Sequence, residues 1–289
     1  MYPAAFDYVA PASADEALAK LAEFGDDGRV LAGGQSLIPM MKLRFAFPGT
    51  LVDINRVPGL DTIAVENGHL RIGALVRHND IVNSDVVAGA NKTMAAAAPW
   101  IADPIVRNLG TVGGSVAHAD PLGDWASVML ACNAEVVARS ANGERVIPMT
   151  GFITGPFTTA LETGEMLTEL RVPTQGANAG GTYLKLERKV GDYATCGVAT
   201  HLELGGDGTI SAAGIALTSV APQNVKAVEA EAALVGQTPS EALFAEAAEL
   251  AAQASDPRSD VRGPADYKRD VVRVFTRRGL AQALEQAQG

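Results

Sequence analysis

The stretch Val30-Leu31-Ala32-Gly33-Gly34-Gln35-Ser36 decides the fold class of this chain, because it places a glycine pair directly after a short apolar strand. Two glycines can adopt backbone conformations that other residues avoid, and they let bare N–H groups approach a ligand. Successive N–H groups of this kind form a concave nest that favours anions, phosphate above all. The stretch therefore predicts a phosphate-binding turn, with a ligand-free strand-to-helix turn as the alternative.

A second turn of similar design follows later in the chain. Thr111-Val112-Gly113-Gly114-Ser115 again pairs two glycines with hydroxyl side chains. One such turn is weak evidence for a ligand, but two of similar design are typical of a pyrophosphate held from both sides. We therefore expect the two turns to meet at one dinucleotide.

The first residues predict an α/β layer. Ser13 and Glu16 have the spacing of a capping box for a helix that runs to Phe24. A strand over 29–32, the first glycine turn and a further strand over 50–54 follow. The order helix, strand, glycine turn and helix indicates a phosphate-sized gap at the strand's end.

The last third of the chain has a different pattern. The glycine-rich run 174–181 predicts a linker, and we place a domain boundary near residue 176. Beyond it we expect strands over 182–188, 196–204 and 210–217 and then helices over 225–235, 240–254 and 264–286. Antiparallel strands followed by helices are typical of an α+β unit.

Composition excludes several classes of protein. The chain has 289 residues, a formal net charge of −10 and two isolated cysteines, Cys132 and Cys196. Nonspecific nucleic-acid binding depends on clustered Lys and Arg, which an acidic chain disfavours. Lone cysteines supply neither a disulfide framework nor a paired metal site. Without a long apolar run or a leader-like N-terminus, we expect a cytoplasmic protein with no membrane span.

Reactive motifs are also missing from the sequence. It contains no G-x-G-x-x-G after a strand, no P-loop, no H-E-x-x-H and no G-x-S-x-G elbow. We therefore predict no metal site and no catalytic side chain in this chain. A phosphate nest without a reactive group indicates a protein whose bound cofactor carries out the chemistry.

Three single residues are further candidates, each with a plain structural alternative. Asp124 precedes a helix, so it is either an N-cap carboxylate or a ligand of a ribose hydroxyl. Lys185 shares a strand face with Tyr183 and Glu187, which is either a solvated face or a place for an ammonium beside a reduced, anionic flavin. Tyr193 lies in a glycine-started loop and either fills the core or stacks on a flat ring.

The ordered set of motifs resembles one family, the FAD-binding medium subunits of the molybdenum hydroxylases, and within it the medium subunit of aerobic carbon monoxide dehydrogenase. The resemblance covers essentially the whole chain. It rests on Leu31–Leu37, Asp103–Asn108, Gly110–Ser115, Asp120–Asp124 and Lys185–Ala194.

The resemblance implies an α+β fold of the vanillyl-alcohol-oxidase type, with two lobes that clasp FAD. It implies an N-terminal α/β lobe over 1–57, a central α+β lobe over 58–176, and a C-terminal domain over 177–289 with a three-stranded antiparallel sheet and a helical bundle. The cofactor-binding residues that it implies are Leu31, Ala32, Gly33, Gly34, Gln35, Ser36, Leu37, Ile101, Thr111, Val112, Gly113, Gly114, Ser115, Asp124, Leu167, Lys185 and Tyr193. Among these, Tyr193 is the candidate for gating access to the flavin.

The family also implies a division of labour. A large subunit would oxidise the substrate at a molybdenum cofactor, and a small subunit with two 2Fe-2S clusters would pass the electrons to noncovalent FAD in this chain. Quinone or another acceptor would then take them. We expect a dimer of heterotrimers in the cytoplasm or at the inner face of the membrane. A subunit of a purine or N-heterocycle dehydrogenase, or a stand-alone nucleotide-binding module, remains an alternative.

Overall fold

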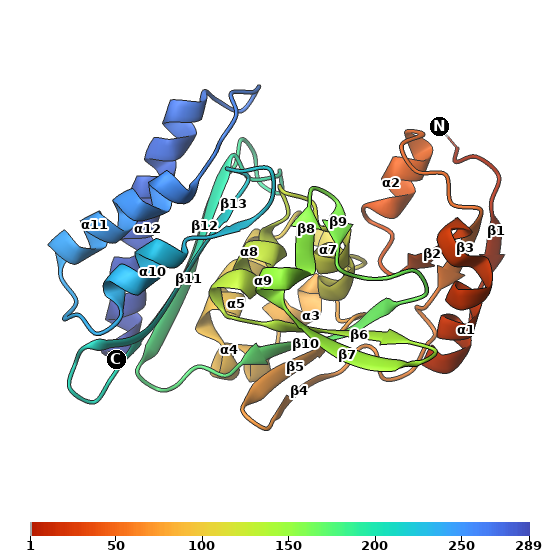
Figure 1. Ribbon diagram of the computed structural model, residues 1–289, viewed down its shortest axis with the longest axis horizontal. Helices are drawn as coiled ribbons and strands as arrows, with labels where there is room; N and C mark the ends of the chain where they lie inside the picture. The colour runs from red at the N-terminus through yellow and green to blue at the C-terminus, as the bar shows by residue number, and fades with distance from the viewer. Residues whose placement is uncertain (1) are drawn as a thin grey trace.

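The computed structural model describes residues 2–289 and shows three lobes in a row (Figure 1). The N-terminal lobe holds a small parallel sheet in the order β1-β3-β2. Its core consists of apolar side chains such as Leu18, Val52 and Ile54. The elements of this lobe are β1 (Asp7–Val9), α1 (Ala14–Phe24), a 3-10 turn (Gly25–Asp27), β2 (Gly28–Leu31), α2 (Leu37–Lys42) and β3 (Thr50–Asp53).

The predicted start of α1 is confirmed. The Ser13 hydroxyl accepts the N–H of Glu16 at 3.1 Å, and Glu16 accepts the N–H of Ala12 at 2.8 Å. These bonds satisfy N–H groups that have no partner within the first helical turn. The helix ends at Phe24 as expected, and Gly25 follows with a positive φ of 56°.

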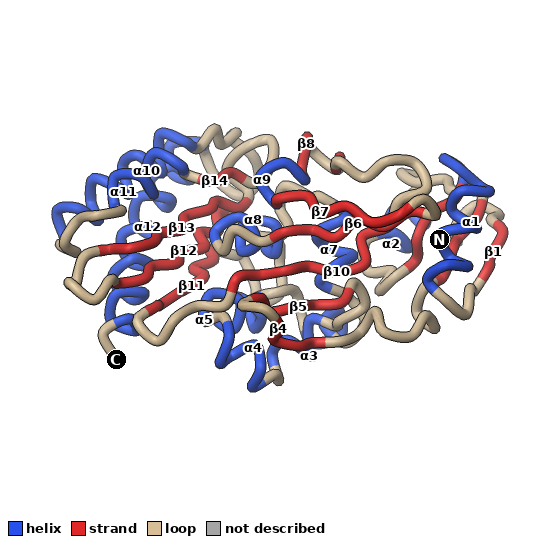
Figure 2. Tube along the Cα trace, turned by 60° about the horizontal axis from the view of Figure 1, so that its bottom comes forward, coloured by secondary structure: helices blue, strands red, loops and turns tan. Residues whose placement is uncertain are grey.

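The central lobe is built on a five-stranded antiparallel sheet in the order β4-β5-β10-β6-β7, with helices packed against it (Figure 2). The Asn142-Gly143 hairpin is present between β6 and β7, where Ser140 pairs with Gly143. The strands are β4 (Ile63–Glu66), β5 (His69–Gly73), β6 (Glu135–Ser140), β7 (Gly143–Pro148) and β10 (Met166–Pro173), and a ribbon of β8 (Ile153–Gly155) and β9 (Thr158–Thr159) lies beside them. The helices are α3 (His78–Val82), α4 (Asp85–Ala90), α5 (Lys92–Ala97), a 3-10 turn (Ala98–Trp100), α6 (Pro104–Arg107), α7 (Val112–His118), α8 (Asp124–Ala131) and α9 (Met149–Phe152).

The C-terminal lobe has a sheet of four strands, in the order β11-β12-β13-β14, where the sequence predicted three. The additional strand β14 (Val225–Lys226) has only two residues, which pair with Leu217 and Ala216 of β13. The pattern predicted a helix from residue 225, but the helix begins at Val228. The other elements are β11 (Ala179–Leu186), β12 (Cys196–Leu204), β13 (Ile210–Thr218), α10 (Val228–Leu234), α11 (Glu241–Ala254) and α12 (Ala265–Ala287).

This sheet lies between two helical layers. Helices α10, α11 and α12 cover its outer face, and α5 and α8 of the central lobe lie on the other side (Figure 1). Gly180 and Gly181, which the sequence placed in a linker, belong to β11. A β-carbon at Gly180 would collide with the Ala283 carbonyl of α12, and one at Gly181 would collide with the Thr93 hydroxyl of α5. Gly180 therefore allows close packing of β11 on α12 within the C-terminal lobe, and Gly181 allows close packing of β11 on α5 of the central lobe.

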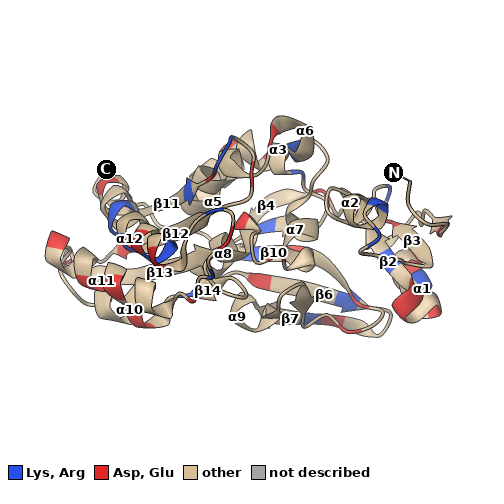
Figure 3. Ribbon diagram, turned by 90° about the horizontal axis from the view of Figure 1, so that it is seen from above, with Lys and Arg blue, Asp and Glu red and all other residues tan. Residues whose placement is uncertain are grey.

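Acidic residues lie along α10 and α11, at the far end of the molecule from the N-terminal lobe (Figure 3). They include Glu229, Glu241, Glu246 and Glu249. Over residues 2–289, no helix combines the length and apolar character that crossing a membrane requires.

Candidate functional site

The two glycine turns lie against each other, at the junction of the N-terminal and central lobes. A β-carbon on Gly33 would collide with the carbonyl oxygen of Leu109, just before the second turn. Arg77 ties the two segments together, because its guanidinium donates to the Leu109 carbonyl at 2.6 Å and to Asn55 Oδ1 at 2.7 Å. Asn55 in turn donates to the Ala32 carbonyl at 2.7 Å. The sequence missed Arg77 and Asn55, which lie outside both motifs.

The first turn has free backbone donors. Gly34 adopts a left-handed conformation with φ at 70°, as the nest requires. The Ile38 N–H donates to the Gly34 carbonyl at 3.1 Å and opens α2, while the N–H groups of residues 33–37 donate to no acceptor within residues 2–289. Gln35 contributes a weak internal bond from its amide to the Gly33 carbonyl at 3.3 Å. Five successive N–H groups therefore remain for an anionic ligand.

The second turn differs from the predicted nest. Gly113 and Gly114 lie in the first turn of helix α7 and have no positive φ. Thr111 caps this helix, and its hydroxyl accepts the N–H of Gly114 at 3.0 Å. Gly113 is needed for packing, because a β-carbon there would lie 2.6 Å from the Ala74 Cα. The N–H of Val112 donates to the Val76 carbonyl. Among the described residues, the backbone N–H groups of this turn without an acceptor are therefore those of Thr111 and Gly113.

Asp124 is not an N-cap. It is the first residue of α8, Gly123 holds the cap position, and the Asp124 carboxylate accepts bonds from the C-terminal sheet. The Tyr183 hydroxyl donates to Oδ1 at 2.5 Å, and the Lys185 ammonium donates to Oδ2 at 2.9 Å. Burial raises the pKa of Asp124, and the Lys185 charge opposes that rise. The pKa of Tyr183 is raised well above its usual value, because burial and the Asp124 charge both disfavour the phenolate.

Lys185 does not lie on a solvated face. Its side chain is 1% exposed, and the ammonium also donates to the Trp100 carbonyl at 3.0 Å. Glu187 Oε2 lies 3.6 Å from the same ammonium, without a hydrogen bond among residues 2–289. The strand alternation that grouped Tyr183, Lys185 and Glu187 was therefore right, but the face that they share is buried rather than wet.

Tyr193 does not fill the core. It is 47% exposed in the loop between β11 and β12. Burial of its hydroxyl and the nearby Asp120 charge raise the pKa of Tyr193 to about 12, so the phenol stays protonated. The loop is anchored by Asp192, which pairs with Arg188 at 3.0 Å and with Arg262 at 3.3 Å.

The remaining predicted residues are spread around these groups. Ile101 and Leu167 are both buried in the core of the central lobe. Leu31, Ala32, Ser36, Leu37 and Ser115 are half-buried in or beside the two turns. Their contacts with FAD stay predictions.

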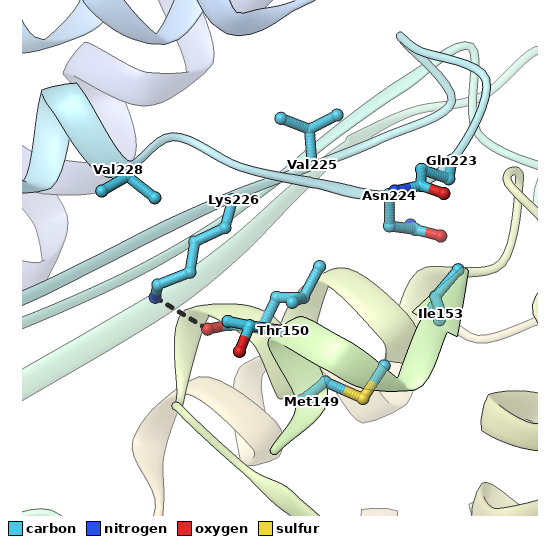
Figure 4. A pocket seen from close by; sticks show the side chains of 9 residues that line it. Met149, Thr150, Ile153, Gln223, Asn224, Val225, Lys226 and Val228 are labelled. Atoms are coloured by element: carbon cyan, nitrogen blue, oxygen red, sulfur yellow. Dashed lines mark hydrogen bonds between the residues drawn. The ribbon is translucent and has the colours of Figure 1, made fainter. Parts of the chain in front are cut away.

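One hollow of the surface lies elsewhere. It has a volume of about 250 Å³ and lies between α9 and the segment 223–228 (Figure 4). Lys226 reaches across it and donates to the Leu130 carbonyl at 2.9 Å. The hollow shares no residue with the two turns. Within residues 2–289, no group of His, Cys, Asp and Glu side chains is arranged to hold a metal ion.

Comparison with known proteins decides the family. Residues 4–175 match the model of the FAD binding domain in molybdopterin dehydrogenase, and residues 181–283 match the CO dehydrogenase flavoprotein C-terminal domain. The chain belongs to the FAD-binding medium subunits of the molybdopterin dehydrogenases. It is therefore the flavoprotein subunit of an oxidoreductase, and the resemblance seen in the sequence is confirmed.

Relatives of this medium subunit match over almost their whole length. It is 42% identical to the carbon monoxide dehydrogenase medium chain of Hydrogenophaga pseudoflava, over 98% of both chains. It is 40% identical to subunit alpha of the 6-hydroxypseudooxynicotine dehydrogenase complex of Paenarthrobacter nicotinovorans, over 99% of this chain and 97% of the relative. The structure of a Hydrogenophaga pseudoflava carbon monoxide dehydrogenase that lacks the Mo-pyranopterin moiety superimposes with a TM-score of 0.96, at 44% identity and 99% coverage of both chains.

The residues of this medium subunit fit FAD. Five N–H groups over 33–37 and two more at Thr111 and Gly113 offer donors to a pyrophosphate from adjoining segments. Gly33 is in direct contact with the second segment, so the N–H groups of the two segments lie close to each other. Asp124 and Lys185 are buried and paired with each other, and their contact with FAD stays a prediction.

Proposed function

We propose that this chain is the FAD-carrying, electron-transfer subunit of a carbon monoxide dehydrogenase. The observation that supports this most strongly is the full-length identity of 42% to such a medium chain, which covers both domains. In the proposed complex, a large subunit with a molybdenum cofactor oxidises the substrate, and a small subunit with two 2Fe-2S clusters carries the electrons to this chain. Quinone or another acceptor receives them.

In this proposal FAD can hold two electrons and exchange them singly with one-electron carriers. The residues of the chain position the FAD. The N–H groups over 33–37, with those of Thr111 and Gly113, bind the pyrophosphate. Asp124 accepts a hydrogen bond from a ribose hydroxyl of the cofactor. Lys185 places its ammonium group beside the ring system, and Tyr193 covers the exposed face of the ring.

We also propose that FAD binds without a covalent bond. The thiols Cys132 and Cys196 are both buried, and burial raises the pKa of Cys132 to about 11 and that of Cys196 to about 12. Neither thiol is therefore a ready nucleophile at neutral pH. Acid precipitation of the complex should leave all the flavin in the supernatant, and flavin in the pellet would contradict this point.

A second candidate is the medium subunit of an N-heterocycle or purine dehydrogenase, which the 40% identity to a 6-hydroxypseudooxynicotine dehydrogenase subunit favours. Both candidates use the same flavin site, so the substrate has to be tested on the complex. Carbon monoxide should bleach the flavin absorbance of the anaerobic complex. Bleaching by an N-heterocycle alone would favour the second candidate.

The assembly is part of the proposal. We propose a dimer of heterotrimers in the cytoplasm or at the inner face of the membrane, and lobes at 1–57, 58–176 and 177–289. Size measurement together with a visible spectrum tests the assembly. A colourless monomer that binds adenine nucleotides and no flavin would instead indicate a stand-alone nucleotide-binding module.

A further inference from the structure

We infer that Tyr183 is a positioning residue for the FAD site, where it holds the Asp124 carboxylate through a buried cluster of hydroxyl groups that joins α8 to the C-terminal sheet. The inference rests on the proposed function, because Asp124 belongs to the same site. Tyr183 lies on β11, in the domain that follows the FAD-binding domain along the chain.

The cluster contains three hydroxyl groups. The Tyr183 oxygen lies 2.5 Å from Asp124 Oδ1 and 3.1 Å from the Thr218 hydroxyl. The Thr218 hydroxyl is in hydrogen-bond contact with Ser127, and Ser127 donates to the Asp124 carbonyl at 3.0 Å. The chain of contacts thus starts and ends on Asp124. Because an ionised carboxylate only accepts, the Tyr183 proton is directed at Asp124.

The fold makes room for this hydroxyl. A β-carbon on Gly197 of β12 would collide with the Tyr183 oxygen. Gly197 lies opposite Lys185 on one side and opposite Thr218 on the other. The glycine therefore keeps the space in which the tyrosine reaches Asp124, and Tyr183 is itself only 2% exposed.

Without Tyr183, Asp124 would keep one strong partner, Lys185. Oδ1 would lose its donor in a buried site, and an unpaired buried acceptor is costly. The carboxylate would then turn or take up a proton, and in either case it would present a different surface to FAD. A hydrogen bond to a charged group contributes enough free energy to change a dissociation constant about tenfold. Its loss should therefore raise the FAD dissociation constant by that factor or more.

The charge on Asp124 provides a second measurement, which is the pH dependence of FAD binding. The titratable groups that face it are Tyr183 and Lys185 from β11, Glu187 just after β11, and Tyr193 from the loop between β11 and β12. The Tyr183 hydrogen bond lowers the pKa of Asp124 against the rise that burial causes. In Tyr183→Phe, Asp124 should therefore take up a proton at higher pH, and FAD affinity should begin to fall at higher pH than in the wild type.

The test uses the purified complex, stripped of FAD and titrated with FAD by flavin fluorescence across roughly pH 5 to 8. Tyr183→Phe should raise the FAD dissociation constant about tenfold or more and move the acid limb of the profile upward. Tyr267→Phe is the matched control, because Tyr267 is 47% exposed and its hydroxyl forms no hydrogen bond within residues 2–289. It should behave as the wild type.

The possible results separate the inference from the proposed function. A wild-type complex that takes up no FAD overturns the proposed function. A wild-type complex that binds FAD beside a Tyr183→Phe variant with the same affinity and profile overturns the inference alone. Should Tyr183→Phe not fold, Thr218→Val takes its place. It removes a partner of Tyr183 and leaves Asp124 intact, and it should weaken FAD binding in the same direction by a smaller factor.

Discussion

Gly33 and Leu109 are in backbone contact, although they belong to different lobes, and no side chain fits between them. The contact brings the free N–H groups over 33–37 close to the segment that carries the free N–H groups of Thr111 and Gly113. In the proposed function these two segments, distant in the sequence, form the dinucleotide site, and its geometry depends on how closely they approach.

The first prediction is that Gly33→Ala abolishes FAD loading. The new methyl would collide with the Leu109 carbonyl, so the two segments must separate. We expect a loss of stability of about 1–3 kcal/mol and a flavin content more than tenfold below that of the wild type. Absorbance of the purified complex measures the flavin, and thermal unfolding measures the stability.

Gly89→Ala is the matched control for this change. Gly89 is exposed on α4, and a β-carbon there would meet nothing within 4 Å. Alanine favours a helix over glycine by roughly 1 kcal/mol, so this variant should keep its flavin and unfold no earlier than the wild type. Normal flavin content in Gly33→Ala would mean that the first turn is only a tight turn.

The second prediction concerns Lys185 and the stability of the chain. Lys185→Met leaves the Asp124 carboxylate buried without its cation, and breaking a buried pair in this way costs about 3–5 kcal/mol. The pKa of Asp124, already raised by burial, then rises further. A carboxyl whose folded-state pKa is raised takes up protons on folding, so the variant loses stability as pH increases.

Thermal unfolding of Lys185→Met should therefore show a deficit that is larger at pH 8 than at pH 5. The double variant with Asp124→Asn removes the unpaired charge and should recover part of the loss at both values. A deficit independent of pH, or no recovery in the double variant, would show that Lys185 contributes packing rather than charge.

The third prediction is a loss of stability in mild acid that comes from His78. Burial lowers the pKa of His78 to about 4, and its Nδ1 accepts the indole N–H of Trp125 at 3.0 Å. The unfolded chain takes up this proton near its ordinary pKa and the folded chain does not. The stabilisation is therefore complete above about pH 6.5 and is lost as pH falls toward 4, to a limit on the order of 3 kcal/mol.

Urea unfolding at pH 7.5 and pH 5 measures this slope. His78→Gln keeps an acceptor for Trp125 and does not titrate, so its free energy of unfolding should change less between the two conditions. His201, whose pKa burial also lowers to about 4, keeps contributing to the remaining slope. An unchanged slope in His78→Gln would exclude His78 as the source.

Much of this architecture could be predicted from local sequence. The Ser13 cap and the Asn142-Gly143 hairpin depend on neighbouring residues, and both are present. Properties that depend on distant contacts were missed. Gly113 lies in α7 and packs against Ala74, and Lys185 is buried beside the Trp100 carbonyl and the Asp124 carboxylate of α8. Strand alternation groups side chains on one face but does not show what covers that face.

The same reason explains why the sequence missed Tyr183. It was grouped with Lys185, but a tyrosine in a strand most often packs as an ordinary aromatic side chain. Only the position of α8 brings its hydroxyl to Asp124, and only Gly197 leaves room for it. Arg77 and Asn55 were missed similarly, because they hold the two turns together from outside both motifs.

The last prediction is that Tyr193 controls access to the flavin without contributing much to stability. The residue is 47% exposed, so Tyr193→Ala should change the free energy of unfolding by only about 0.5 kcal/mol. Loss of a stacked aromatic ring should brighten the flavin fluorescence of the complex and speed its reoxidation by a small soluble dye.

Tyr193→Phe keeps the ring and loses only the hydroxyl, whose pKa of about 12 keeps it protonated in any case. It should match the wild type in both measurements. Equal fluorescence and equal reoxidation rates in Tyr193→Ala and the wild type would place the ring away from the flavin, because removing a covering group must change the solvent and dye access of whatever it covers.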